Sequence, residues 1–185
     1  MMNDDQQEFT FTLEDVKKAF MSISNDTSAG PDAIEIKTIK NIDPDFTIHC
    51  LLFNIQFAFG RLLPQWQLGR LCLIPKTGKN LNDLSNWRPL SIYNVGLRAL
   101  MKIVARTVFP YTNIHPAQKG FMPGENAIDN IYKVKNAIKH AVKNRRELWI
   151  TAFDAKAAFD SGSREHMREC IKKLCLPSKI EQIYL

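Results

Sequence analysis

The segment at residues 148–154 is the feature that most constrains what this chain can fold into. It is a short apolar run that ends in a carboxylate, which predicts a strand with Asp154 at its end. Apolar residues recur at helical spacing over residues 128–142, which predicts a long amphipathic helix before that strand. Together they predict a mixed fold, α/β or α+β. A carboxylate in this place can hold a metal ion, and an Asp that caps a turn is the alternative.

The composition is that of a folded, basic protein. The chain has 185 residues, 45% of them hydrophobic, which suits one domain with a core or part of a larger one. The 25 Lys and Arg residues outnumber the 19 Asp and Glu residues, so the net charge is +6 and the pI is near 9.2. This balance favours polyanionic partners, although a solvated basic surface explains it equally well. No repeat or linker interrupts the chain, which predicts one folding unit.

Several other classes of protein are disfavoured. The four cysteines form no Cys-x-x-Cys pair and have no His at zinc spacing, so neither a zinc site nor a disulfide framework is indicated. The amino terminus is acidic and polar, unlike a secretory leader or a transit peptide, which predicts an intracellular protein. The longest apolar stretch, residues 50–59, is interrupted by Asn54 and Gln56 and is too short to cross a bilayer.

Helical periodicity and turn residues predict the remaining elements. Thr12 is a predicted N-cap, with Asp15 as the partner in a capping box, for a helix that ends before Asn25. Residues 46–62 are apolar nearly all round, which predicts a buried helix stopped by Gly60. The other predicted elements are a strand at 70–75, an extended piece at 87–92, a helix from Leu97 to Val108 and a final helix capped by Ser163.

Two short segments contain candidate phosphate ligands. Lys76 and Lys79 stand beside Gly78 in a predicted turn, where a lysine can act as a point charge for a triphosphate. A hydrated hairpin tip is the alternative for this pattern. Arg88, in Trp87-Arg88-Pro89, can bind a phosphate through its guanidinium, or it can satisfy a carboxylate in a loop.

Five segments in a fixed order resemble one known family. They are Ser28-Ala29-Gly30-Pro31-Asp32, Leu73-Ile74-Pro75-Lys76, Asn86-Trp87-Arg88-Pro89-Leu90-Ser91-Ile92, Gln118-Lys119-Gly120-Phe121 and Phe153-Asp154-Ala155-Lys156-Ala157-Ala158-Phe159-Asp160-Ser161. Their order and spacing are similar to those of the reverse transcriptase domain of non-LTR (LINE-type) retrotransposons, from about residue 9 to the last residue. If the five segments were ordinary turns or surface positions, five independent explanations would have to coincide in this order. The joint pattern is therefore specific to this family.

The resemblance implies an incomplete right-hand polymerase, with helices packed on a small antiparallel sheet of palm and fingers. Residues 1–185 are expected to be a partial reverse transcriptase domain, the amino-terminal half. Residues 9–147 would form the fingers and the start of the palm. Residues 148–185 would form the first palm strand and the helix that follows it.

For the activity, the resemblance implies an RNA-directed DNA polymerase with Mg²⁺ as cofactor. Asp154 matches the first catalytic aspartate, a metal ligand, and the backbone carbonyl of Phe153 or Ala155 would complete the metal shell. In two-metal phosphoryl transfer, a primer 3′-hydroxyl attacks the α-phosphate of a deoxynucleoside triphosphate (dNTP). The implied partners are therefore an RNA template, a DNA primer and the dNTP, with no membrane.

The resemblance also implies four residues that contact the dNTP or shape its pocket. Lys76 and Arg88 match positions where the fingers meet the triphosphate. Gln118 lies in the loop that shapes the nucleotide and template pocket. Phe159 matches the bulky residue under the sugar that excludes a 2′-hydroxyl, and an ordinary core Phe at a helix start is the alternative.

The sequence departs from the family pattern in its carboxylates. The family's Tyr/Phe-x-Asp-Asp hairpin supplies the remaining metal ligands, and it is absent here, since Asp4-Asp5 is the only Asp-Asp pair. Glu125 stands where relatives commonly carry Arg, and Gly162 where they often carry Val. We therefore expect a polymerase fragment that is inactive alone. The alternatives are a non-catalytic nucleic-acid-binding remnant and an inert pseudogene product.

Overall fold

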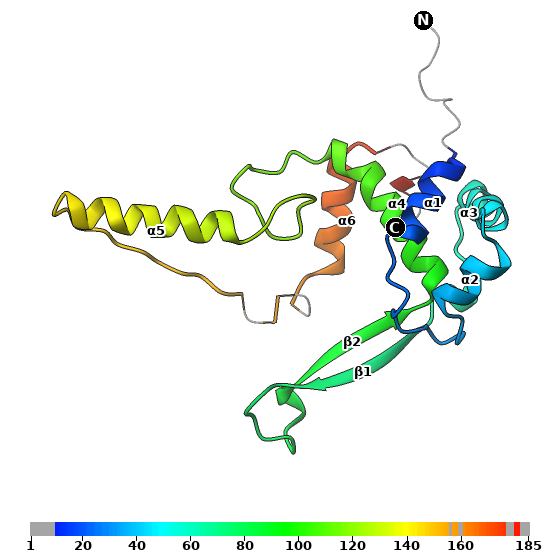
Figure 1. Ribbon diagram of the computed structural model, residues 1–185, viewed down its shortest axis with the longest axis horizontal. Helices are drawn as coiled ribbons and strands as arrows, with labels where there is room; N and C mark the ends of the chain where they lie inside the picture. Colours follow the sequence, from blue (N-terminus) through cyan, green and yellow to red (C-terminus); the bar gives the residue numbers. More distant parts are fainter. Residues whose placement is uncertain (1–9, 156, 159–160, 177–179, 182–185) are drawn as a thin grey trace, which may run out of the picture. The chain divides into compact units, whose positions relative to one another are not determined.

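Helices and strands are both present in a computed structural model of the chain, which describes residues 10–155, 157, 158, 161–176, 180 and 181 (Figure 1). The fold is therefore mixed, as the sequence predicts. In chain order the elements are α1 (Leu13–Met21), α2 (Ile36–Ile42), α3 (Thr47–Phe59), η2 (Pro64–Trp66), β1 (Gly69–Pro75), η3 (Leu84–Asn86), β2 (Trp87–Tyr93), α4 (Val95–Val108), η4 (Phe109–Tyr111), α5 (Ile128–Lys143) and α6 (Arg164–Lys173).

The chain divides into two units rather than the single folding unit that the sequence predicts. The first comprises Met1–Tyr111 with Arg168–Leu185, and the second comprises Thr112–Met167. The physical reason lies in the second unit, where Ala141 is the only buried residue among those described. Its apolar side chains therefore do not build a core of their own.

Helix α1 begins at the capping box that the sequence predicts. The Thr12 hydroxyl accepts a hydrogen bond from the Asp15 backbone N–H at 3.1 Å, and the Asp15 carboxylate accepts one from the Thr12 N–H at 3.3 Å. These two bonds satisfy donors that the first turn of a helix otherwise leaves free. Val16 and Phe20 are fully buried on the inner face, and the helix ends at Met21, before Asn25.

The core of the first unit consists mainly of side chains from α1, α3 and α4, with Ile36 and Ile39 of α2 and Trp66 of η2. The Phe20 ring stacks on Phe46, with ring centroids 4.9 Å apart, and on Phe53 at 5.8 Å. Phe53 meets Trp66 edge to face, also at 5.8 Å. Helix α4 adds a buried face made by Val95, Leu97, Ala99, Leu100, Ile103 and Val104. Burying one large apolar side chain contributes roughly 1.5–3 kcal/mol, so this core holds α4 firmly against α1.

Helix α3 is buried on one side only, so the prediction of a helix buried nearly all round is wrong. Phe53, Gln56 and Phe57 are its buried residues, whereas Leu51 is 63% exposed and Phe59 78%. An apolar composition on all sides of a helix does not show which side is buried. In α3 the buried side is the one that packs against α1 and the core. The predicted stop at Gly60 is confirmed, because Gly60 is the C-cap with φ of 60°.

Strands β1 and β2 form an antiparallel hairpin whose register runs from Gly69 opposite Tyr93 to Pro75 opposite Trp87. Figure 1 shows the hairpin leaving the helices of the first unit directly before α4. Apolar residues on both faces, Leu71, Leu73, Ile74 and Leu90, are between 45% and 62% exposed. The strands predicted near 70–75 and 87–92 are thus confirmed, as a two-stranded sheet in the described part of the chain.

The predicted strand that ends at Asp154 is not formed in the described residues. Residues 146–155 have no regular secondary structure, and Trp149 and Phe153 are 89% and 94% exposed. A strand requires a neighbouring strand for its backbone hydrogen bonds, and none of the described residues pairs with this segment. Among the described helices, none is long and apolar enough to cross a membrane.

Candidate functional site

Lys76 and Arg88 are brought together at the end of the hairpin that is remote from α4. Arg88 lies opposite Ile74 in the ladder, and the Lys76 backbone N–H donates to the Asn86 carbonyl at 2.8 Å, which extends the pairing by one residue. Side chains alternate between the faces of a sheet. Lys76 and Arg88 therefore fall on the same face, as two neighbouring cations.

Their two side chains differ in what they contact. The Lys76 ammonium donates to the Ser85 carbonyl at 2.7 Å and is half-buried, so it closes the loop between the strands. The Arg88 guanidinium is exposed and makes no hydrogen bond or ion pair with the residues described. A loop carboxylate was the alternative partner for Arg88, but Asp83 instead accepts from the Ser85 N–H and hydroxyl at 2.8 Å each. Of the two cations at this end of the hairpin, Arg88 is therefore the one whose side chain is available to a ligand.

Gln118 lies in a loop of the second unit that an ion pair organises. Its side-chain amide donates to the Gly120 carbonyl at 2.9 Å, and the side chain is exposed. The neighbouring Lys119 ammonium meets the Glu125 carboxylate at 2.8 Å, with the Lys119 side chain only 14% exposed. Glu125 therefore neutralises a lysine of its own loop, which gives a structural reason for an acidic residue at this position.

Asp154 is exposed, and its carboxylate makes no hydrogen bond or ion pair with the residues described. Those residues also contain no group of three His, Cys, Asp or Glu side chains that could hold a metal ion. Mg²⁺ gives up its hydration reluctantly and needs several oxygen ligands, so Asp154 alone does not make a metal site. Phe159, the predicted sugar-contacting residue, lies outside the described residues.

The turn at residues 28–32, one of the five family-like segments, packs against the root of the hairpin. The Arg98 guanidinium donates to the Ser28 carbonyl at 3.2 Å, and Arg70 donates to the Ala29 carbonyl at 3.3 Å. A Cβ atom on Gly30 would lie 2.6 Å from the Asn94 Cα, so only glycine allows this approach. Two segments that lie far apart in the sequence, the turn and the end of β2, thus meet at one place.

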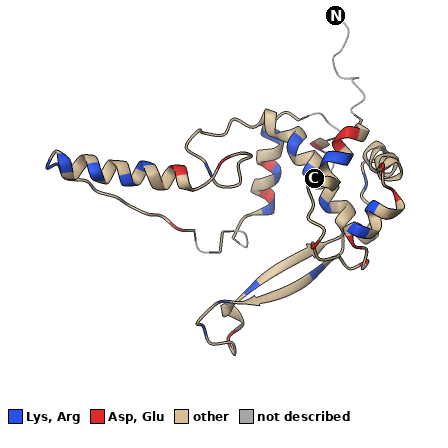
Figure 2. Cartoon of the chain, in the orientation of Figure 1, with Lys and Arg blue, Asp and Glu red and all other residues tan. Residues whose placement is uncertain are grey.

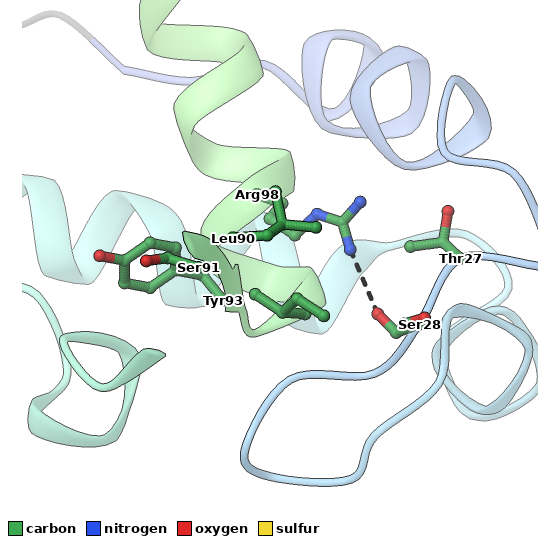
Figure 3. Close-up of a pocket in the computed structure, with 7 residues that line it drawn as sticks. Thr27, Ser28, Leu90, Ser91, Tyr93 and Arg98 are labelled. Carbon is green, nitrogen blue, oxygen red and sulfur yellow. Dashed lines mark hydrogen bonds between the residues drawn. The ribbon is translucent and has the colours of Figure 1, made fainter. Parts of the chain in front are cut away.

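A pocket of about 290 Å³ lies where the turn and the hairpin meet. Figure 3 shows Arg98 reaching from α4 to Ser28, with Tyr93 and Ser91 on the side of the hairpin. Arg70 and Arg98 were not among the predicted site residues. The signal available in the sequence was that Arg70 is the one cation in a predicted apolar strand, and that Arg98 begins a row of cations four residues apart in a predicted helix. The lining residues are Thr27, Ser28, Leu90, Ser91, Ile92, Tyr93 and Arg98.

Helix α5 carries four of the nine Lys and Arg residues in the sequence of the second unit (Figure 2). Lys135, Lys139 and Lys143 are spaced four residues apart and so share one side of the helix, whereas Lys133, two residues before Lys135, lies on the other side. All four are exposed. This row of ammonium groups is an electrostatic match for a chain of phosphates.

The sequence is similar to a family of known polymerases. The model for the reverse transcriptase (RNA-dependent DNA polymerase) family matches residues 74–184. The Pol polyprotein of retrotransposable element R2DM from Drosophila melanogaster is 29% identical over 168 residues, covering 90% of this chain and 15% of that protein. The Pol polyprotein of element R2 from Nasonia vitripennis is 28% identical over 175 residues, covering 88% and 16%.

A polymerase from another kind of mobile element is equally similar. The RNA-directed DNA polymerase from mobile element jockey of Drosophila melanogaster is 29% identical over 160 residues, covering 80% of this chain and 17% of that protein. In all three comparisons the chain therefore spans less than a fifth of its relative's length.

Proposed function

Since the chain belongs to the reverse transcriptase (RNA-dependent DNA polymerase) family, we propose that it contributes fingers and the first part of the palm to RNA-directed DNA synthesis by a retrotransposon protein. The observation that carries this proposal is the family match over residues 74–184, which contains Lys76, Arg88, Gln118, Asp154 and Phe159. The template would be RNA, and the primer would be DNA.

In the proposed reaction, the primer 3′-hydroxyl attacks the α-phosphate of a dNTP, an ester bond forms, and pyrophosphate leaves. Arg88 is suited to neutralise the triphosphate because its guanidinium is exposed and has no partner among the described residues. Lys76 is suited to a different task. Its ammonium already binds the Ser85 carbonyl, so it positions the loop beside Arg88 and adds charge as a neighbour.

Reverse transcriptases use divalent metal ions, and Mg²⁺ is the ion proposed here. We assign Asp154 as one of its oxygen ligands. The described residues do not supply the others, because they contain no cluster of three suitable side chains. When bound, the metal supplies electrostatic stabilisation of the phosphoryl group being transferred. Gln118 is proposed to shape the pocket through the loop that its amide closes on Gly120.

Primer extension tests this proposal, using a protein in which residues 1–185 are joined to the remaining polymerase domain of one of the relatives. We expect Asp154→Asn to abolish incorporation on an oligo-primed RNA template. Arg88→Ala should lower kcat/KM for dNTP by about tenfold or more, because a hydrogen bond to a charged group contributes roughly 1.5–3 kcal/mol. Arg61→Ala, which removes an exposed guanidinium outside the hairpin, is the matched control and should change little.

The 185-residue chain alone is the second control, and it should incorporate no dNTP. Primer extension by the 185-residue chain alone that depends on Asp154 would contradict the proposal that the other metal ligands come from the remaining polymerase domain. Full activity of both Asp154→Asn and Arg88→Ala in the joined protein would contradict the proposed site.

Phe159 is proposed to exclude ribonucleotides by contact with a 2′-hydroxyl. In the same joined protein, Phe159→Ala should raise ribonucleotide incorporation relative to deoxynucleotide incorporation, and each tenfold change in the kcat/KM ratio corresponds to about 1.4 kcal/mol. If Phe159 is an ordinary core residue, the substitution should instead cost roughly 3–5 kcal/mol of stability and depress both substrates alike. An unchanged ratio in a folded, active variant would exclude the sugar contact.

A second candidate function is binding of nucleic acid without chemistry. Two observations favour it: the row of exposed lysines on α5, and the absence of a three-residue metal cluster in the described part of the chain. Primer extension separates the two functions, because a binding remnant would retain RNA affinity and would stay inactive after the remaining domain was added.

A further inference from the structure

A second groove lies in the first unit, along one side of α4. Its apolar lining consists of Leu97, Met101 and Ala105 from α4, faced by Leu62, Trp66 and Tyr93, with Gln67 at the edge. The volume is about 600 Å³, roughly twice that of the pocket beside Arg98 and Ser28. We call this the α4 groove. None of its residues was assigned a role in polymerisation above, although Tyr93 and Arg98 also line the pocket beside Ser28.

One border of the α4 groove is uniformly basic. Arg98 and Lys102 line it, and Arg106 continues the same row, since residues four apart lie on one side of a helix. Helix α4 contains no Asp or Glu, and no carboxylate of the described residues forms an ion pair with these three cations. Burial, followed by the charges of Arg106 and Arg98, lowers the pKa of Lys102. The row is thus self-repelling, and an anionic partner would relieve the repulsion.

The three cations keep hydrogen-bond donors for such a partner. Lys102 donates to the carbonyl and hydroxyl oxygens of Ser22 at 3.1 and 2.9 Å, which leaves one of its three donors. Arg98 uses one of its five donors for the Ser28 carbonyl. Arg106 is exposed and makes no hydrogen bond or ion pair with the residues described. Its loss should therefore not disturb the fold.

The lining favours a peptide over a nucleic acid. A base binds such a surface by stacking on an open aromatic face, but Trp66 is only 7% exposed. The Tyr93 ring is 39% exposed and also lies against Gly69, where an added Cβ would lie 3.0 Å from Cε1, so it offers less open area than a free ring. The surface that remains is aliphatic in character, from Leu62, Met101 and Ala105. Aliphatic side chains one helical turn apart fit it better than flat bases.

We propose that the α4 groove binds an acidic amphipathic peptide helix from a partner protein. Its apolar side chains would fill the space between Met101 and Leu62, and its carboxylates would pair with Lys102 and Arg106. This is a helix-in-groove interaction, in which apolar residues provide the affinity and the charged border fixes the orientation. It is independent of the proposed polymerase activity.

Fluorescence anisotropy with the full chain tests the proposal. The probe is a labelled synthetic peptide of about five helical turns, with leucines spaced three and four residues apart and a glutamate after each leucine. Arg106→Glu should weaken binding by about fivefold or more at low salt, since an exposed ion pair is worth up to about 1 kcal/mol and reversal adds repulsion. Lys17→Glu makes the same change of charge on the exposed side of α1 and should weaken binding less than twofold.

A second variant tests the apolar part of the groove. Ala105→Trp should fill the α4 groove and abolish binding, while Ala137→Trp, on the exposed surface of α5, should not. Circular dichroism and thermal unfolding establish that each variant is folded. A peptide with lysines in place of glutamates should bind Arg106→Glu better than it binds the wild-type chain.

Three results would overturn the proposal. The first is equal binding of a scrambled peptide of the same composition, and the second is no binding of the designed peptide. The third is a single-stranded RNA oligonucleotide that binds with the same dependence on Arg106 and Ala105 and displaces the peptide. That result would make the α4 groove a nucleic-acid site.

Discussion

At the scale of single residues, Asp43 shows how a few hydrogen bonds determine the start of a helix. Asp43 is 5% exposed, and its carboxylate accepts a hydrogen bond from the His49 backbone N–H at 3.0 Å and contacts His49 Nδ1 at 2.7 Å. Burial acts to raise the pKa of Asp43, but the hydrogen bonds from His49 and Ile48 outweigh it and hold the pKa below the ordinary value of 3.8. The ionised carboxylate is therefore stabilised in the folded state.

This lowered pKa predicts how stability depends on pH. A group whose pKa is lower when folded contributes stability above its unfolded pKa, and that contribution is lost as the pH falls through the folded pKa. We expect Asp43→Asn to lower the free energy of unfolding by roughly 1–3 kcal/mol at pH 7 and to flatten the loss of stability as the pH falls from about 5 through the lowered pKa of Asp43. Urea unfolding at several pH values measures both. Asp45→Asn, at a nearby exposed position, is the control, and equal losses in the two variants would contradict the argument.

The residues that could be predicted are those whose partners are close in the sequence. Thr12 and Asp15 are three residues apart, so their capping box follows from local geometry alone. The partner of Lys76 could not be predicted, because Ser85 comes near only when the hairpin forms. Arg98 and Ser28 are 70 residues apart, and their contact depends on how α4 packs against α1. Those contacts decide which cations remain open to a ligand.

At the scale of secondary-structure elements, Gly60 determines where α3 ends and how the chain continues. Its φ is 60°, and its N–H donates to the carbonyls of Gln56 and Phe57. Gln56 also accepts a hydrogen bond from the Leu63 N–H at 2.9 Å, which directs the chain toward Trp66 in the core. Left-handed backbone costs a residue with a Cβ about 1–2 kcal/mol.

We therefore expect Gly60→Ala to lower the free energy of unfolding by about 1–2 kcal/mol, and Gly60→Asn by less, because asparagine tolerates this conformation. Urea denaturation of the three proteins gives the ranking. If the Gly60→Ala variant were as stable as the wild-type protein, the left-handed conformation of Gly60 at the end of α3 would be contradicted.

Elements with local periodicity could be predicted, and elements that depend on distant partners could not. The helices beginning at Leu13, Val95 and Ile128 follow from apolar spacing, since their hydrogen bonds are internal. The hairpin is also local, because one loop joins both strands. The segment before Asp154 has the composition of a strand, but its hydrogen bonds would come from other strands, and the described residues provide none.

At the scale of the whole molecule, the excess of positive charge predicts weak, sequence-tolerant RNA binding that depends strongly on salt. Each phosphate neutralised on a single strand contributes about −0.7 to the slope of log affinity against log salt concentration. We expect Lys139→Ala on α5 to make this slope shallower by about 0.7, and Lys17→Ala on α1 to leave it nearly unchanged. Titration of a labelled RNA at several salt concentrations checks this. Tight binding that is insensitive to salt would exclude a surface of this kind.

The register of the hairpin also has a consequence for how copies of such a sequence can vary. Because side chains alternate along a strand, losing or gaining one residue within β1 or β2 would move the residues beyond it to the opposite face. Arg88 would then point away from Lys76. The same change in the connecting loop, between Gly78 and Leu81, would leave the paired residues in register. Length variation should therefore be tolerated at the tip and damaging in the strands, whatever the identity of the residue involved.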